Sequence, residues 1–359
     1  MSTDSVDLGH DHPYLPTTWL EQRRRISSVA DLVELSSAFR ASKTMLSAVE
    51  LGVFTELAKG PLNEEQLRTR LGLHARAAAD FLDALVSLGL LDRDGDGRYA
   101  NTPVADQVLD RAKPGYLGGV MEMRSTRLYQ FWGNLTEALR TGQPQNEARN
   151  GGDPFSAIYA DPTRLRAFQR AMSALSLEAV RALAEKFPWQ QYRTVADLGC
   201  SEGALLGQVA LRHPHLRGTG HDLPAVRAGF EEYVADLGLS DRLAFRPLDF
   251  FVDPLPTADV LVFAHILHDW DTDTKLTLLR KAYDALPDGG AVVVLEALID
   301  DDRRVNTFGL LQSLNMLIET PGGFDFTAAA GRDWLTEAGF RDIRAEHLAG
   351  PEGMLVAVK

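Results

Sequence analysis

The chain is poor in cysteine, in basic side chains and in long apolar runs. Its 359 residues include one cysteine, Cys200, and 37 lysines and arginines against 50 acidic residues. One thiol excludes an intramolecular disulfide and a cysteine-based zinc cage. The net charge of −13 disfavours a nucleic-acid partner, which requires a basic face. No apolar run approaches the roughly 18–20 residues of a membrane span, and the N-terminus lacks the pattern of a signal peptide. We therefore expect a cytoplasmic protein that binds neither membranes nor nucleic acid.

Two nucleotide-binding motifs are also missing. The chain has no G-x-x-x-x-G-K-[ST], the loop that cradles the phosphates of ATP. The first strand–helix loop of its α/β region does not carry the G-x-G-x-x-G fingerprint of dinucleotide sites, which argues against NAD-dependent hydride transfer.

The N-terminal part of the chain predicts a polar tail followed by helices. Residues 1–16 are polar and predict a flexible tail. Apolar residues at helical spacing over 26–58 leave faces that one chain does not cover, so we expect a homodimer. Residues 61–101 predict helix, turn, helix and a small hairpin, which is the winged-helix outline. Two aspartates on its second helix, Asp80 and Asp83, favour a structural or dimerising role over DNA binding.

The remainder predicts a helical segment and then an α/β domain. Residues 111–187 are helical and rich in methionine and aromatic side chains, which form a core or line a pocket for a flat ligand. From residue 188 to 359, short apolar strands alternate with helices. This alternation predicts a doubly wound α/β sheet, whose ligands bind beyond the carboxyl ends of the strands.

Acidic residues end three successive predicted strands. Asp197 ends the first, and Gly199 and Gly203 after it let the backbone approach a ligand closely. Asp222 ends the second, where it can accept both hydroxyls of an adenosine ribose or, alternatively, cap the next helix. Asp249 and Phe250 end the third and suit an adenine amine and ring face. Together they predict a ligand that contains adenosine.

A histidine and two acids follow on the later strand ends. The run HILHDW places His268 at the end of the fourth strand, with Glu296 ending the next and Asp325 in a later loop. Such a group suits general-base chemistry, because an acid fixes the tautomer of the imidazole. A metal site at His265 and His268 is disfavoured, since no carboxylate stands at ligand spacing. Whether His265 contributes to the site stays open.

These motifs together carry a family resemblance. DLGCSEG, HDLP, LDFF, HILHDW, ALPDGGAVVVLEA and NMLIETPGG, in this order, resemble the S-adenosylmethionine-dependent O-methyltransferases of the caffeate and hydroxyindole type, in particular their bacterial natural-product relatives. The resemblance spans about residues 28–359. It implies a winged-helix dimerisation domain over 17–110, a linker with acceptor-pocket helices over 111–187, and a Rossmann-like methyltransferase domain over 188–359. S-adenosylmethionine is the implied cofactor, with S-adenosylhomocysteine as its product, and no metal is implied.

The resemblance also implies roles for individual residues. His268 is the implied base, flanked by the acids Glu296 and Asp325. The implied donor-binding residues are Ser176, Asp197, Gly199, Gly203, Asp222, Leu223, Asp249 and Phe250. The implied acceptor-binding residues are Phe168, Met172, Asp269, Asn315 and Met316.

The chain departs from the family pattern at three places. Cys200, Ser201 and Glu202 stand where a glycine-richer loop is common, Ala264 replaces a frequent basic residue, and Phe326 replaces a frequent arginine after the second acid. We predict methylation of a hydroxyl on a small aromatic acceptor in secondary metabolism, such as antibiotic biosynthesis. Ring C-methylation ortho to a phenolic hydroxyl is the alternative, because the same base serves both. A winged-helix regulator or a methyltransferase without activity is a lesser alternative.

Overall fold

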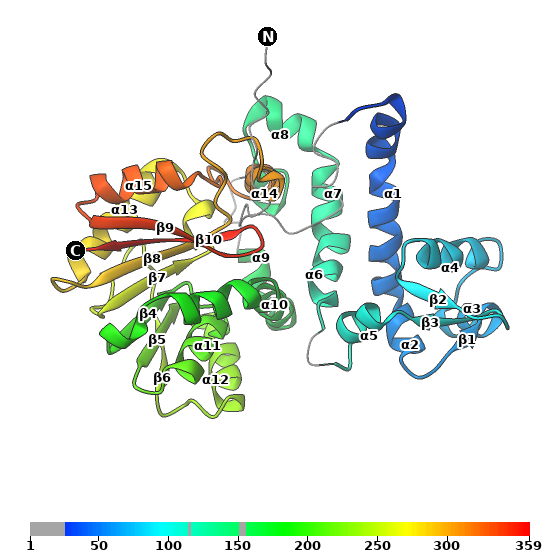
Figure 1. Cartoon of the computed structure of the whole chain (residues 1–359), viewed down its shortest axis with the longest axis horizontal. Helices are drawn as coiled ribbons and strands as arrows, with labels where there is room; N and C mark the ends of the chain where they lie inside the picture. Colours follow the sequence, from blue (N-terminus) through cyan, green and yellow to red (C-terminus); the bar gives the residue numbers. More distant parts are fainter. Residues whose placement is uncertain (1–25, 114–115, 151–155) are drawn as a thin grey trace, which may run out of the picture. The chain divides into compact units, whose positions relative to one another are not determined.

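The computed structural model describes residues 26–113, 116–150 and 156–359 (Figure 1). The predicted flexible tail, residues 1–16, lies outside the described residues. The chain forms two compact units, one made mainly of residues 25–133 and one made mainly of residues 134–169 and 176–359. Helix α10 (Pro162–Lys186) contributes to both, with residues 170–175 assigned to the first unit. The helical segment expected over 111–187 is thus divided between the two units.

The first unit contains the predicted winged helix. Its elements are α1 (Val29–Leu51), α2 (Val53–Leu57), β1 (Leu62–Asn63), α3 (Glu64–Leu71), α4 (Ala78–Ser87), β2 (Leu91–Arg93), β3 (Arg98–Asn101), α5 (Pro103–Leu109), α6 (Gly118–Met123), a π-helical turn (Arg124–Leu128) and α7 (Tyr129–Trp132). The strands form an antiparallel sheet of order β1-β3-β2. The winged-helix prediction is confirmed.

Local capping chemistry sets the helix ends in this unit. The Asn63 side chain accepts the N–H of Gln66 at 2.9 Å and begins α3, and Gly52 ends α1 in the left-handed region at φ 77°. Helix α4, the second helix of the winged-helix outline, begins at Ala78. There the ring of His74 accepts the N–H of Arg76 at 3.1 Å, which holds a turn before the helix.

The second unit is built around a seven-stranded sheet. Its elements are α8 (Leu135–Thr141), α9 (Ser156–Tyr159), most of α10, β4 (Thr194–Leu198), α11 (Ala204–Arg212), β5 (Arg217–Asp222), α12 (Arg227–Asp236), β6 (Leu243–Pro247), β7 (Val260–Ala264), α13 (Thr272–Ala285), β8 (Ala291–Glu296), α14 (Thr307–Glu319), α15 (Ala328–Glu337), β9 (Arg341–Ala349) and β10 (Glu352–Val358). The strand order is β6-β5-β4-β7-β8-β10-β9. The first five strands of that order run parallel, and β10 pairs antiparallel with both β8 and β9.

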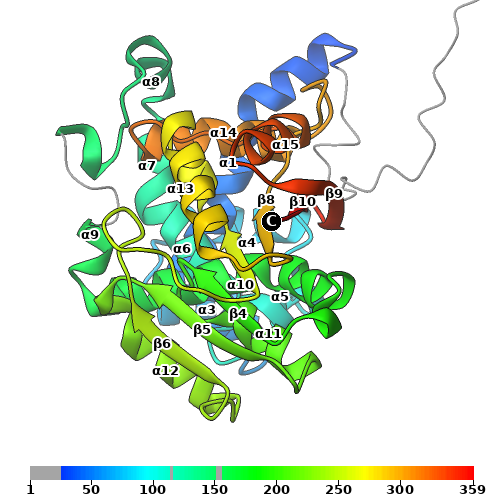
Figure 2. The same cartoon turned by 90° about the vertical axis from the view of Figure 1, so that its left-hand side faces the viewer.

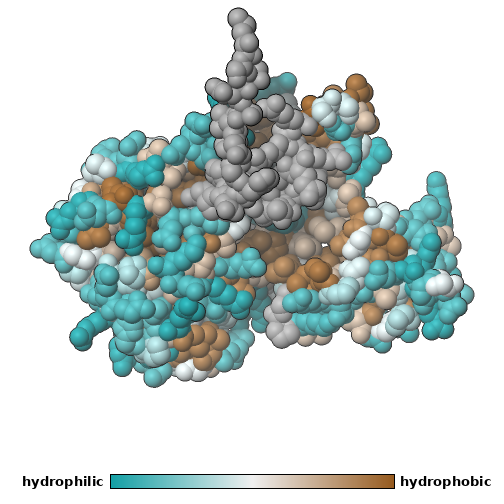
Figure 3. Space-filling model, viewed as in Figure 1, coloured by the Kyte–Doolittle hydropathy of each residue, from teal (hydrophilic) through white to brown (hydrophobic). Residues whose placement is uncertain are grey.

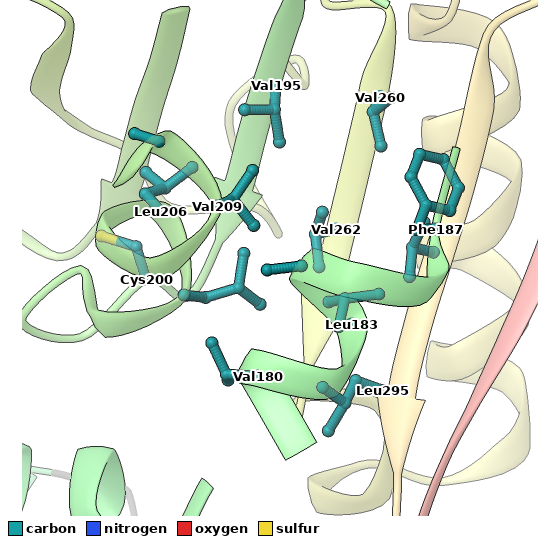
Figure 4. Packing of buried hydrophobic residues seen from close by; sticks show 14 of the residues in the cluster. Val180, Leu183, Phe187, Val195, Cys200, Leu206, Val209, Val260, Val262 and Leu295 are labelled. Atoms are coloured by element: carbon teal, nitrogen blue, oxygen red, sulfur yellow. The ribbon is translucent and has the colours of Figure 1, made fainter. Parts of the chain in front are cut away.

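Helices cover both faces of this sheet, as the doubly wound prediction requires (Figure 2). Alternate residues of each strand face opposite cores. On β7, Val260 and Val262 pack with α10, α11 and α12, whereas Leu261 and Phe263 pack with α13 and α15. Figure 4 shows the first of these cores, where Leu183 of α10 lies against the strands. The predicted Rossmann-like α/β fold is confirmed.

The parallel register carries the polar strand ends to one edge of the sheet. Leu198 pairs with His221 of β5 and with Phe263 of β7, so β4, β5 and β7 end nearly level. Asp197, Asp222 and Glu296 therefore lie at the same edge, where the parallel strands have their carboxyl ends. Among the described residues, no helix has the length and apolar character needed to cross a membrane.

Candidate active site

His268 lies in a turn that is attached to β8 at two points. Strand β7 ends at Ala264, because His265 adopts the left-handed region at φ 54°. The placement of His268 at the end of the strand itself was wrong: it lies in a 3-10 turn, Leu267–Asp269. The N–H of His265 donates to the carbonyl of Leu295 at 2.9 Å, and the N–H of His268 donates to Oε1 of Glu296 at 3.2 Å.

The imidazole of His268 faces three carboxylates. Its Nδ1 lies 3.1 Å from Oε2 of Glu296 and 3.3 Å from Oδ1 of Asp325. Its Nε2 lies 3.7 Å from Oδ1 of Asp269. His268, Glu296 and Asp325 are 8%, 1% and 1% exposed. Two acids at Nδ1 favour the tautomer with the proton on that nitrogen, so the lone pair of the neutral ring lies on Nε2.

Burial and charge compete in setting the proton affinity of this group. Burial disfavours the imidazolium of His268, but Glu296, Asp269 and Asp325 outweigh it and hold the pKa of His268 well above its ordinary value. Burial raises the pKa of Asp269 to about 7 despite the attraction of His268. For Glu296, the attraction of His268 outweighs burial and lowers the pKa. His268 therefore combines high proton affinity with an oriented ring.

Asp325 joins the network although the family's usual arginine is absent after it. Phe326 stands in that place and is buried in the core beneath α13 and α15. The N–H of Asp325 donates to Oγ of Ser313 on α14 at 3.2 Å, which attaches the loop of Asp325 to that helix. Helix α14 thus fixes the backbone of Asp325, and His268 is the hydrogen-bond partner of its side chain.

Two glycines of the loop after β4 are set by backbone conformation and by close packing against side chains of this chain. Gly199 and Gly203 adopt φ 82° and 86°. A Cβ at Gly199 would lie 2.2 Å from Cδ1 of Ile266, and one at Gly203 would lie 2.6 Å from the ring of Phe230. Glycine is required at both positions by conformation and by space.

Asp222 organises this loop and does not cap a helix. Its Oδ2 accepts the N–H of Ser201 at 3.0 Å, and its Oδ1 accepts the N–H of Leu223 at 2.7 Å. Neither the turn at Pro224 nor α12 has a side-chain cap, so the alternative of a helix-capping role is wrong. Burial raises the pKa of Asp222 to about 6 against the effect of these N–H groups.

The buried carboxyl groups of this edge fit a ligand that donates hydrogen bonds and carries positive charge. Asp197 is 2% exposed, and its Oδ1 has no hydrogen-bond partner among the described residues. Burial and the nearby Asp222 raise the pKa of Asp197 to about 7. The hydroxyls of a ribose and a cationic group would supply the missing partners. The residues present therefore fit an adenosine-containing cation such as S-adenosylmethionine.

Aromatic rings gather at the turn after β6, which ends at Pro247, so Asp249 and Phe250 follow the third strand and do not end it as predicted. The ring of Phe250 lies 4.8 Å from that of Phe251 and 6.3 Å from that of Trp270, in edge-to-face arrangements. Oδ1 of Asp249 accepts the N–H of Phe251 at 2.9 Å, which tightens the turn. The corner offers a ring face next to a carboxylate, the combination expected for adenine.

Five of the predicted acceptor- and donor-binding residues lie on two helices. Phe168, Met172 and Ser176 follow one another at intervals of four on α10 and so share one of its faces. Asn315 and Met316 lie on α14, where Met316 is buried and Asn315 is half-buried. Helix α14 contacts the turn Leu267–Asp269 that carries His268.

Two charged contacts of the site escaped the sequence analysis. Nε2 of His265 lies 3.0 Å from Oε2 of Glu352 at the start of β10, and the rings of His265 and His268 lie 6.0 Å apart. Lys275 of α13 is fully buried near the acids. A polar residue inside an apolar helix stripe was the available signal for Lys275. Nothing in the pattern pointed to Glu352, which comes from an antiparallel strand.

Ligand-type atoms of His268, Glu296 and Asp325 also lie within 4.8 Å of one another. Their spacing is accounted for by the hydrogen bond between Nδ1 of His268 and Oδ1 of Asp325 and by the ion-pair contact of Nδ1 with Oε2 of Glu296.

We predict that Asp197→Asn stabilises the free protein at high pH. The pKa of Asp197 is about 7 in the folded protein and near 4 in an unfolded chain, so its ionisation costs stability as the pH rises between these values. The variant should exceed the wild type by about 1–4 kcal/mol at pH 8 and match it near pH 4. Urea unfolding at both pH values measures this difference.

Asp259→Asn is the control of opposite sign. Burial acts to raise the pKa of Asp259, but the N–H groups of Arg193 and Thr194 outweigh it and lower that pKa. Its variant should be less stable than the wild type at pH 8. Equal stability of Asp197→Asn and wild type at pH 8 would contradict the burial of an unpaired carboxylate at Asp197.

Comparison with known proteins shows the family of the chain. The model of the O-methyltransferase domain matches residues 132–341, and that of the O-methyltransferase dimerisation domain matches residues 33–111. The chain is 44% identical over 329 residues to the tetracenomycin polyketide synthesis 8-O-methyl transferase of Streptomyces glaucescens, covering 92% of this chain and 96% of that one. It is 36% identical over 337 residues to an N,N-dimethyltransferase of Streptomyces rimosus, covering 93% and 97%.

A solved structure agrees with these relatives. The crystal structure of human N-acetylserotonin methyltransferase in complex with SAM has a TM-score of 0.85 and 30% identity, over 93% of this chain and 98% of that chain. The resemblance inferred from the motifs is confirmed, and the chain belongs to the O-methyltransferase family.

Proposed function

We propose that the protein methylates a hydroxyl of a small aromatic acceptor in secondary metabolism, with S-adenosylmethionine as the methyl donor and His268 as the general base. The observation that carries this proposal is the buried group of His268, Glu296 and Asp325 at the carboxyl edge of the sheet. Family membership supports the enzyme class and the donor. The acceptor class is supported by the names of two similar proteins, a polyketide 8-O-methyl transferase and an N-acetylserotonin methyltransferase.

The chemistry follows from the proton affinity and orientation of His268. A phenol has a pKa near 10 and is a poor nucleophile at neutral pH. S-adenosylmethionine, when bound, supplies a methyl group on a sulfonium. Nε2 of His268 takes the phenolic proton, while Glu296 and Asp325 hold Nδ1–H and stabilise the imidazolium. The remaining contribution of the protein is to position the two reactants and exclude water.

Residue roles at the two binding regions are part of the proposal. Asp197, Gly199, Gly203 and Ser176 would hold the methionine part of the donor, and Asp222 with Leu223 would hold the ribose. Asp249 and Phe250 would hold the adenine. The acceptor would be bound by Phe168, Met172, Asp269, Asn315 and Met316. The half-buried Phe168 and Met172 on one face of α10 support an apolar wall.

We propose further that the protein is a homodimer formed through its N-terminal helices. The domain division expected at residues 17–110, 111–187 and 188–359 belongs to the same proposal, supported by the family match over 33–111. Helix α1 exposes large apolar side chains that one chain leaves uncovered, and Figure 3 shows hydrophobic surface along it. They are Val29, Leu32, Val33, Leu35 and Phe39, each at least 51% exposed. Burying such a stripe against a second copy stabilises a dimer.

The oligomeric state is tested by light scattering at micromolar concentration. We expect about twice the 39.5 kDa of one chain, and a shift towards that single-chain mass for a variant with Leu32→Asp and Phe39→Asp, because charge opposes burial. A wild-type protein found only at 39.5 kDa would contradict the dimer.

Donor binding and product mass test the proposed function. Calorimetric titration should give micromolar affinity for S-adenosylmethionine and S-adenosylhomocysteine and no binding of NAD. The complex is then incubated with 3-hydroxy-2-naphthoate, N-acetylserotonin and 1,8-dihydroxyanthraquinone, and a gain of one methyl is read by mass. NMR of the product distinguishes oxygen from carbon as the methylated atom. Donor binding without turnover of any aromatic hydroxyl would contradict the acceptor class.

The general base is tested by His268→Ala. We expect turnover to fall by roughly 10²–10⁴, because the phenolic proton loses its acceptor. Donor affinity should stay within about three-fold, since His268 contacts acids and not the loop after β4. Single-turnover rates and calorimetry on the same preparation separate the two effects. Turnover near the wild-type value would overturn the assignment.

A further inference from the structure

Lys275 is a charged side chain buried in an aromatic cage. It is 0% exposed, and its Nζ lies 3.3 Å from the ring centroid of Phe324 and 5.7 and 5.6 Å from those of Phe326 and Trp334. The same Nζ donates to the carbonyl of Trp270 at 2.5 Å and to the carbonyl of Phe324 at 3.2 Å. Burying an ammonium is costly unless such partners are present.

The two carbonyls belong to the two loops that carry the proposed base and its acid. Trp270 follows the turn of His268 by two residues, and Phe324 directly precedes Asp325. The two loops are joined to each other at Nδ1 of His268 and at Nζ of Lys275. A shift of either carbonyl would therefore move His268 relative to Asp325.

Negative charge surrounds this ammonium from several elements. Four carboxylates face the ammonium of Lys275. They are Glu296 of β8, Asp325 in the loop between α14 and α15, Asp269 of the 3-10 turn and Asp271 before α13. Burial lowers the pKa of Lys275 to about 8 against their attraction, so the side chain is mainly cationic at pH 7. Lys275 thus offsets the repulsion among acids that the site brings together.

A second lysine of α13 makes an analogous bridge at the adenine corner. Nζ of Lys281 donates to the carbonyl of Phe250 at 2.5 Å and to the carbonyl of Asp253 at 2.7 Å. These contacts close the turn that contains Asp249 and Phe250. One helix therefore fastens two different parts of the site, each through one lysine.

We propose that Lys275 is a positioning residue for the methyl-transfer step: it fixes the loop of His268 against the loop of Asp325 and leaves donor binding to other contacts. Lys281 fixes the turn of Asp249 and Phe250 in the same way and affects the binding of the methyl donor alone. The inference rests on the proposed function, because turnover is its principal readout.

The test compares Lys275→Met and Lys281→Met with Arg280→Met as the neutral control on the same helix. Arg280 makes an exposed ion pair with Glu337 and should change nothing. Lys275→Met should lower kcat by about 10- to 100-fold, because small misplacements at a reacting centre have effects of that size. Its affinity for S-adenosylhomocysteine by calorimetry should stay within about two-fold of the wild type. Lys281→Met should give the reverse pattern, with weaker affinity and a near-normal kcat at saturating donor.

Two further measurements distinguish a positioning role of Lys275 from a general loss of folded structure: the melting temperature and the dependence of kcat on pH. Methionine fills the aromatic cage but leaves the carbonyls of Trp270 and Phe324 without this donor and removes a cation from among the acids, so the melting temperature of Lys275→Met should fall. Its kcat and its affinity are therefore both measured well below that temperature. Loss of the cation raises the pKa of His268 and of its acids, so the acidic limb of kcat against pH should move to higher pH only in this variant.

The outcomes distinguish the inference from the function on which it rests. Absence of wild-type turnover on the three hydroxyaromatic probes would count against the proposed function. An active wild type with Lys275→Met inside two-fold of its kcat, or with kcat and affinity reduced together, would overturn the positioning role. Should Lys275→Met fail to fold, Lys275→Gln is held to the same criterion: a lower kcat at unchanged affinity supports the role, and an unchanged kcat overturns it.

Discussion

Burial of several carboxyl groups at one edge of a parallel sheet is the constraint on which this site depends. The register of β4, β5, β7 and β8 carries Asp197, Asp222 and Glu296 to that edge, and burial disfavours the ionised form of each. Every acid therefore needs a donor or a cation. Backbone N–H groups donate to Asp222, and the backbone N–H of His268 donates to Oε1 of Glu296, whose Oε2 lies 3.1 Å from the imidazole. Oδ1 of Asp197 has no partner in the described part of the chain, which leaves a place for a ligand.

The sequence predicted those features that depend on neighbouring residues. The alternation of short strands and helices over 188–359 followed from apolar periodicity. The acids at the strand ends were recognisable because parallel strands end at one edge. Each of these depends on chain-local chemistry or on one general rule of α/β sheets.

Features that depend on distant parts of the chain could not be predicted in the same way. The contact of His265 with Glu352 spans 87 residues and requires the antiparallel placement of β10 beside β8. Lys275 reaches a carbonyl 49 residues away, at Phe324. The helix-cap alternative for Asp222 failed because the N–H of Ser201, 21 residues earlier, takes one of its oxygens. Tertiary contacts outweighed local preference at all three positions.

The backbone at His265 has a consequence for how this site tolerates change during evolution. Glycine adopts the left-handed region at φ 54° without strain and asparagine adopts it at a small cost, whereas a β-branched residue is strained there. Whether a substitution of His265 is tolerated therefore depends first on how readily the new residue adopts this backbone conformation, and only then on its chemical similarity to histidine. A glycine would retain the turn that leads to His268 and lose the partner of Glu352, whereas a valine would oppose the turn itself. In a comparison of related chains, an exchange of histidine for glycine at this position would leave the turn intact, although the two side chains have nothing in common.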